Sequence, residues 1–259
     1  MRVIPEIPWF PGWLLQRTAW SALPSYDNPR QLFAACGIGF GVPTYRSRPE
    51  TNFARYRAAT LPGKVAESGL QALIDARAAD LESGGPETLP ALEDYLAATA
   101  GRLQMLVAES LTGGQLSPQT QTAVKATGMA WGLVGMIRAV AFQAHHSSQL
   151  ILPRREMKAS GVREGDLMNH TMTAQLGELV ARMAARADAQ LAIARAVSAA
   201  VERAALPALL PCVLAEGYLR QLRRAGWNPF VRGLDRPGVR TLMRLWWRAR
   251  RGRYYTRCR

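Results

Sequence analysis

The 259-residue chain has few cysteines and no long apolar run, and each absence excludes a class of protein. Cys36, Cys212 and Cys258 lie too far apart for a CxxC zinc knuckle or a disulfide framework. The longest apolar stretches, 126–137 and 204–215, fall short of the roughly 20 residues that span a bilayer. The chain also starts without the cationic and apolar segments of a secretory signal. We therefore expect a cytoplasmic protein with no structural metal and no membrane span.

Acidic residues are scarce, with 19 Asp and Glu against 33 Lys and Arg and a net charge of +14. Apolar residues make up 48% of the chain, which is enough for a packed core and excludes a disordered or fibrous protein. The basic excess is concentrated in residues 240–259, which contain many arginines and no carboxylate.

Arginine interleaved with tryptophan and tyrosine in this tail is suited to an anionic membrane surface on the cytoplasmic side. A nucleic-acid backbone offers the same electrostatics, but we consider it the weaker partner. A solvated helix end that only favours solubility is the plain alternative. The candidate membrane or anion patch consists of Arg244, Trp246, Trp247, Arg248, Arg250, Arg251 and Arg253.

From about residue 65 onward the apolar spacing is helical, and no stretch alternates long enough for a strand, so we predict an all-α body. A Gly-Gly-Pro break at 84–86 separates two helices of a hairpin. Ser117 and Pro118 predict the start of a central helix that runs to about residue 142. A long Ala-rich helix is expected over 173–205, and two more follow it.

Residues 1–58 differ from this body, because prolines recur too often for long helices and neither period is sustained. We predict an irregular segment that is a non-native N-terminus, with a natural irregular extension as the alternative. Residues 59–259 form the expected helical domain.

Three segments in this domain resemble the squalene/phytoene synthase family. LIDARAADL at 73–81 is similar to the family's helical segment with two aspartates. LEDYLAATAG at 92–101 resembles its Tyr-Cys-x-x-Val-Ala-Gly helix, with Tyr95 in place. Residues 132–162 resemble the signature in which an Asn-x-x-Arg-Asp-x-x-x-Asp helix leads into a Leu-Pro segment.

The resemblance implies an all-α, isoprenoid-synthase-type bundle around an apolar cavity, here without its N-terminal helices. In the family, two Asp-rich motifs hold Mg²⁺ ions on prenyl diphosphates. Only Arg138 is retained in the signature helix, while Gly135, Ala139 and Gln143 stand where the family has Asn and two Asp. We therefore expect no metal site, with Mg²⁺ as a cofactor only if the chain is an active prenyltransferase.

Four residues are candidates for binding an anion or lining the cavity: Tyr95, Arg138, Asp75 and Asp80. Arg138 lies on an apolar helix, where a charge needs an ionic partner or a bound anion. Asp75 and Asp80 lie roughly 140° apart around a helix, so they do not form a metal pair by themselves.

The segment 137–143 is similar to the Leu-Arg-Ala-x-Pro-Tyr-His pattern of the phytoene-synthase-like assembly factor of respiratory complex I. This resemblance implies a non-catalytic, membrane-peripheral assembly factor with complex I subunits as partners and a lipid or prenyl diphosphate in the cavity. The alternative is a Mg²⁺-dependent prenyltransferase that joins two prenyl diphosphates head to head.

Overall fold

The computed structural model describes residues 67–78, 85–146, 152–231 and 239–251, all within the unit 40–259. In these ranges the chain is helical and contains no strand, which confirms the predicted all-α class. The expected irregular segment 1–58 lies outside the described residues, so that boundary stays a prediction. None of the described helices is both long enough and apolar enough to cross a bilayer.

The first helices form the hairpin that the Gly-Gly-Pro break predicts. Helix α4 (Glu67–Ala78) packs against residues 97–112, which continue the chain after α5 (Leu89–Leu96). The Thr88 hydroxyl accepts a hydrogen bond from the Ala91 N–H at 3.2 Å and thus caps the start of α5. A π-helical turn, η3 (Ala97–Gly101), joins α5 to α6 (Arg102–Thr112).

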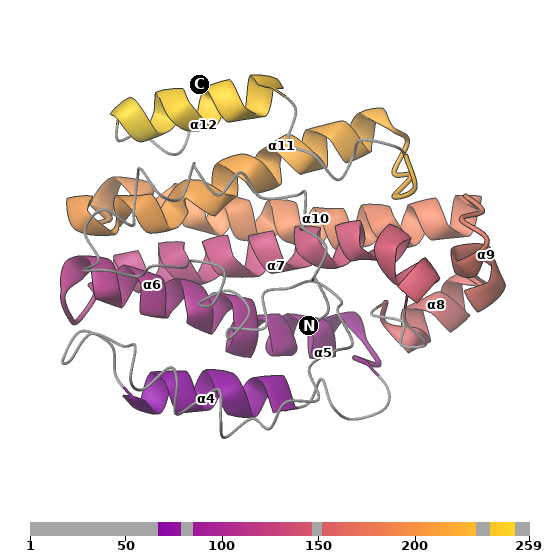
Figure 1. Cartoon of the computed structure of the whole chain (residues 1–259), viewed down its shortest axis with the longest axis horizontal. Helices are drawn as coiled ribbons and strands as arrows, with labels where there is room; N and C mark the ends of the chain where they lie inside the picture. Colours follow the sequence, from indigo (N-terminus) through magenta and orange to yellow (C-terminus); the bar gives the residue numbers. More distant parts are fainter. Residues whose placement is uncertain (1–66, 79–84, 147–151, 232–238, 252–259) are drawn as a thin grey trace, which may run out of the picture. The chain divides into compact units, whose positions relative to one another are not determined.

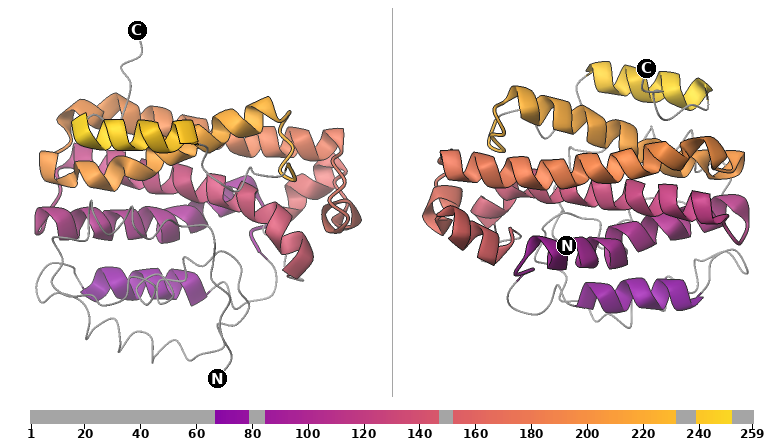
Figure 2. Two further views of the ribbon diagram at one scale, coloured as in Figure 1. Left: turned by 45° about the horizontal axis from the view of Figure 1, so that its top comes forward. Right: turned by 180° about the vertical axis from the view of Figure 1, so that it is seen from behind.

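The central helix is α7 (Pro118–His146), and its predicted start is confirmed. The Ser117 hydroxyl accepts from the Thr120 N–H at 3.3 Å. Figures 1 and 2 show α7 running beside α10 (Ala174–Val197) through the middle of the bundle. Along the chain, the short helices α8 (Arg154–Ser160) and α9 (Glu164–Met168) lie between α7 and α10.

Small residues let η3 approach α7 closely. A Cβ added at Gly128 would lie 2.5 Å from the Ala100 carbonyl oxygen, and one at Gly132 would lie 2.8 Å from Leu96 Cδ2. At Gly128 the neighbouring atom belongs to the backbone, so there is no room for a side chain, whereas at Gly132 the Leu96 side chain would have to shift. The Ala- and Gly-rich composition of α7 is therefore a packing requirement of its central position.

The expectation that one helix spans 173–205 is wrong. Helix α10 ends at Val197, and 3₁₀ turns η4 (Ser198–Ala200) and η5 (Arg203–Leu209) follow. After this interruption, the Glu202 carboxylate accepts a hydrogen bond from the Ser117 N–H at 2.9 Å. A hydrogen bond from the Thr120 hydroxyl, together with those from Ser117, lowers the pKa of Glu202. The interruption at 198–202 therefore caps the central helix.

The last two helices lie on the side of α7 and α10 opposite α4 (Figure 2). Helix α11 (Leu210–Arg224) contacts α7, α10 and α12 (Val239–Arg251). A Cβ at Gly217 would lie 2.6 Å from Thr241 Cγ2, so the α11 backbone approaches α12 closely at this point. The apolar side chain of α12 that is most deeply buried is Leu245, at 4% exposure.

Candidate functional site

Arg138 of α7 lies against aromatic rings at the interface with α11. Its guanidinium carbon is 4.1 Å from the ring centroid of Tyr218 and 5.9 Å from that of Trp131. The two rings themselves are 6.1 Å apart. A guanidinium over an aromatic face gains electrostatic attraction that grows as water is excluded. The rings therefore hold the charge in place on an otherwise apolar stretch of α7.

The pocket beside this arginine is small. It has a volume of about 10 Å³, which is about the room of one water molecule. Pockets for drug-sized ligands have volumes of roughly 300–1,000 Å³. The space is lined by Val134, Ile137, Arg138, Tyr218, Leu219 and Leu222. A prenyl chain would fit at this place only after the α7–α11 interface opened.

The family's metal-binding positions are occupied by residues without carboxylates. Positions 135, 139 and 143 recur every four residues and therefore share one face of α7. Gly135 is buried, and Ala139 is 4% exposed. Mg²⁺ requires hard oxygen ligands, so these residues do not fit an ion that bridges a diphosphate. Among the described residues, no three His, Cys, Asp or Glu side chains gather at one point.

The structure places two of the other candidates in local contacts near the start of the bundle. Asp75 is exposed on α4 and accepts a hydrogen bond from Gln71 Nε2 at 2.7 Å. The Tyr95 hydroxyl accepts from Arg77 Nη1 at 2.7 Å, which ties α5 to α4. Asp80 lies outside the described residues. The described contacts thus give Asp75 and Tyr95 structural partners without joining them to Arg138.

Only part of the candidate patch in the tail is exposed to solvent and so could contact a ligand at the surface. Trp246 and Trp247 are 61% and 51% exposed, and Arg244 is also exposed. The side chain of Arg248, by contrast, is only 12% exposed and points inward. Arg250 and Arg251 belong to α12, but their side chains lie outside the description, as does all of Arg253.

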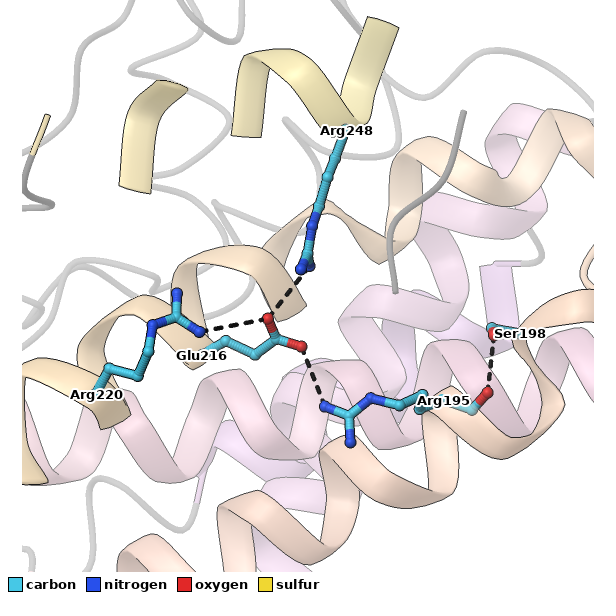
Figure 3. Close-up of polar contacts among 5 residues, drawn as sticks. All are labelled: Arg195, Ser198, Glu216, Arg220 and Arg248. Carbon is cyan, nitrogen blue, oxygen red and sulfur yellow. Dashed lines mark hydrogen bonds and ion pairs between the residues drawn. The ribbon is translucent and has the colours of Figure 1, made fainter. Parts of the chain in front are cut away.

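Arg248 points to Glu216, a carboxylate that the sequence interpretation missed. Glu216 is 8% exposed and lies on α11. Figure 3 shows arginines from α10, α11 and α12 converging on its two oxygens. The closest atoms lie 3.2 Å from Oε1 for Arg195, 3.2 Å from Oε2 for Arg248 and 3.7 Å from Oε2 for Arg220. A buried carboxylate with three guanidiniums therefore joins the last three long helices.

Tyr218 and Trp131 were missed as well, because their role depends on a contact between α7 and α11. The sequence did contain a signal for the burial of Glu216, because it is the sole acidic residue of α11 and stands within an apolar stretch. Acidic side chains are almost never buried without a partner. A lone acid in such a stretch predicts cationic partners, although it does not say which ones.

Comparison with known proteins identifies the fold and the family. The model of the squalene/phytoene synthase family matches residues 46–247. Comparison with curated protein sequences gives no match. The squalene synthase HpnC from Alicyclobacillus acidocaldarius is similar in structure, with a TM-score of 0.62 at 20% identity over 77% of this chain and 83% of that one.

Two further crystal structures share the fold. A dehydrosqualene synthase in complex with a ligand has a TM-score of 0.61 at 17% identity, over 85% of this chain and 74% of that one. YisP from Bacillus subtilis has a TM-score of 0.60 at 14% identity, over 83% and 81% of the two chains. The family match over most of the chain, together with this bundle, shows that the protein belongs to the squalene/phytoene synthase family.

Proposed function

We propose that this chain is a non-catalytic member of its family and acts as a membrane-peripheral assembly factor for respiratory complex I. The observation that supports the loss of catalysis is the composition of α7. This helix carries Gly135 and Ala139 at buried positions where the family has metal-binding side chains, and it retains only Arg138.

The physical reason is the charge of the leaving group. Departure of diphosphate from an allylic carbon needs Mg²⁺ to offset several negative charges, and Mg²⁺ needs carboxylates to hold it. Glycine and alanine have no side-chain oxygen with which to bind Mg²⁺. Arg138 alone supplies one positive charge, and its contacts with the rings of Tyr218 and Trp131 stabilise it without any substrate.

The membrane-peripheral role is supported by α12. Trp246 and Trp247 expose more than half of their surface, and arginines lie beside them on the same helix. Exposed tryptophan next to arginine is typical of helices that lie in a membrane interface. The similarity of segment 137–143 to the assembly-factor pattern is the basis for naming complex I subunits as partners.

A lipid or isoprenoid inside the bundle is a weaker part of the proposal. The space of about 10 Å³ beside Arg138 would have to expand many-fold to hold a prenyl chain. We therefore assign the outer surface of α12, rather than the bundle interior at Arg138, as the primary binding surface.

The alternative is a prenyltransferase that condenses two prenyl diphosphates head to head. The extent of the family match, residues 46–247, favours it. Such an enzyme would need metal ligands from residues other than those of α7, and a substrate beside Arg138 would need the α7–α11 interface to open. These two requirements make it the second choice.

Product analysis separates the two functions. The full chain is incubated with farnesyl or geranylgeranyl diphosphate and Mg²⁺, and the extract is examined for a C30 or C40 hydrocarbon. We expect none. A product that depends on Mg²⁺ and disappears in Asp75→Asn or Asp80→Asn would establish the enzyme instead. Co-purification of the tagged chain with complex I subunits tests the partner, and its absence would contradict the assembly role.

A further inference from the structure

A basic groove lies between α11 and the first turns of α12, on the face of α11 away from the Arg138 site. Its volume is about 220 Å³. Its lining residues are Gly217, Arg220, Gln221, Arg224, Val239, Arg240, Thr241 and Arg244. Four of these eight residues are arginines, and none of the described lining residues is acidic.

The positive charges in the groove are crowded. Burial and the nearby charge of Arg244 lower the pKa of Arg220, although Glu216 acts in the opposite direction. The Glu216 carboxylate is shared with Arg195 and Arg248, so it offsets only part of this charge. An anion between the two helices would relieve the repulsion, and a phosphate matches the planar fork of an arginine.

The start of α12 adds to the same field. Val239, Arg240 and Thr241 form its first turn, and the backbone N–H groups of a first turn have no acceptor within the helix. These groups place the positive end of the helix dipole beside the arginines. The close approach of Gly217 to Thr241 places this end of α12 directly against α11, and this contact forms one side of the groove.

An apolar stripe runs along the first two turns of α12 next to the groove, and position 250, further along the same sector, is an arginine. Val239, Met243 and Trp246 are 73%, 66% and 61% exposed. At roughly 100° of rotation per residue, the three side chains lie within one narrow sector of the helix. Arg240 and Arg244 lie in the adjacent sector, between this stripe and the buried face. An apolar sector bordered by arginines on one side is the geometry of a helix lying in a membrane interface.

We propose that this groove binds the phosphate group of an anionic phospholipid while α12 lies flat on the membrane with Val239, Met243 and Trp246 in the acyl boundary. The proposal rests on the membrane-peripheral function above and specifies the site that carries it. A soluble phosphate compound would present the same group to the arginines but would leave the apolar stripe in water. The stripe is therefore the reason to choose the lipid.

Vesicle sedimentation tests the site. The probes are vesicles of phosphatidylcholine alone and of phosphatidylcholine with phosphatidylglycerol. The test variant is Arg240→Gln with Arg244→Gln, and Arg224→Gln tests the wall formed by α11. The matched control is Arg154→Gln with Arg203→Gln, which removes the same charge from exposed positions outside the groove. Circular dichroism verifies that each variant is folded.

We expect the wild-type chain to bind only the anionic vesicles. Each arginine near an anionic surface contributes about 1 kcal/mol, so the double variant should bind about thirtyfold more weakly and Arg224→Gln about fivefold more weakly. The control pair should bind like the wild type. Val239→Ser with Met243→Ser should weaken binding without changing its dependence on salt, because it removes apolar contact and no charge.

The outcomes distinguish the groove from the wider function. If the wild type binds anionic vesicles and the groove variant binds equally well, the chain is membrane-peripheral but the groove proposal is wrong. If the wild type binds no vesicles, both are wrong. In that case, calorimetric titration with inorganic diphosphate decides whether a soluble anion occupies the groove, since its binding would be lost in Arg240→Gln with Arg244→Gln.

Discussion

Replacing Glu216 by glutamine should destabilise the protein more than any change to an exposed ion pair. The carboxylate is 8% exposed and lies within 4 Å of three guanidiniums on α10, α11 and α12. Glutamine preserves the size of the side chain but removes the charge. Three arginines would then face one another across a partly desolvated space.

The magnitude follows from how far water reaches each arginine. Loss of one partner from a buried ion pair costs about 3–5 kcal/mol. The side chain of Arg248 is 12% exposed, whereas those of Arg195 and Arg220 are 30% and 35% exposed, so solvent relieves part of the repulsion. We therefore expect a loss of about 2–3 kcal/mol in the free energy of unfolding. For a domain of this size, that corresponds to a decrease in Tm of roughly 5–10 °C.

Urea denaturation and calorimetry of the full chain measure this loss. The matched control is Asp188→Asn, which breaks the exposed pair between Arg223 Nη2 and Asp188 Oδ2 at 2.9 Å. Exposed pairs contribute about 0–1 kcal/mol, so the control should change little. In the double variant Glu216→Gln with Arg248→Met, part of the stability should return, because one of the opposing charges is gone. Equal losses in Glu216→Gln and Asp188→Asn would refute the conclusion that this carboxylate joins the three helices.

Three further changes test other parts of the structure. Gly128→Ala should cost about 1–3 kcal/mol in urea denaturation, because its methyl group would lie 2.5 Å from a backbone carbonyl oxygen of η3; wild-type stability would contradict the close approach. Tyr218→Phe should retain the contact with Arg138, whereas Tyr218→Leu should lose about 0.5–2 kcal/mol; equal effects would exclude a role for the ring. The lowered pKa of Glu202 means that the unfolded state takes up its proton first as the pH falls through about 4.5. The stabilisation by the Glu202 carboxylate is therefore complete above that pH and is lost as the pH falls through the lower folded-state pKa. The difference in the free energy of unfolding between the wild type and Glu202→Gln should then become smaller below pH 4.5. A difference that does not change with pH would contradict the lowered pKa.

Local signals in the sequence were sufficient to predict where several helices begin. Ser117 and Pro118 mark the start of α7 because a hydroxyl acceptor and a residue without an N–H suit the first turn of a helix. The Gly-Gly-Pro break and the apolar spacing on either side of it likewise predicted that α4 packs against the helical segment that begins at α5. Each of these features depends on residues that are neighbours in the chain.

Features that depend on contacts between distant segments could not be predicted in this way. The early end of α10 follows from the hydrogen bond between Glu202 and the Ser117 N–H, two residues that are far apart in sequence. Likewise, the inward turn of Arg248 requires a carboxylate on a neighbouring helix. Composition alone made the tail look uniformly basic, but packing places Arg248 against Glu216 and places Arg240 and Arg244 at the groove.

Release of pyrophosphate tests most directly the proposal that the chain is non-catalytic because α7 lacks ligands for Mg²⁺. The full chain is mixed with geranylgeranyl diphosphate and increasing Mg²⁺, and free pyrophosphate is followed over time. We expect a rate equal to that of buffer at every Mg²⁺ concentration. A rate that saturates with both Mg²⁺ and protein would contradict it.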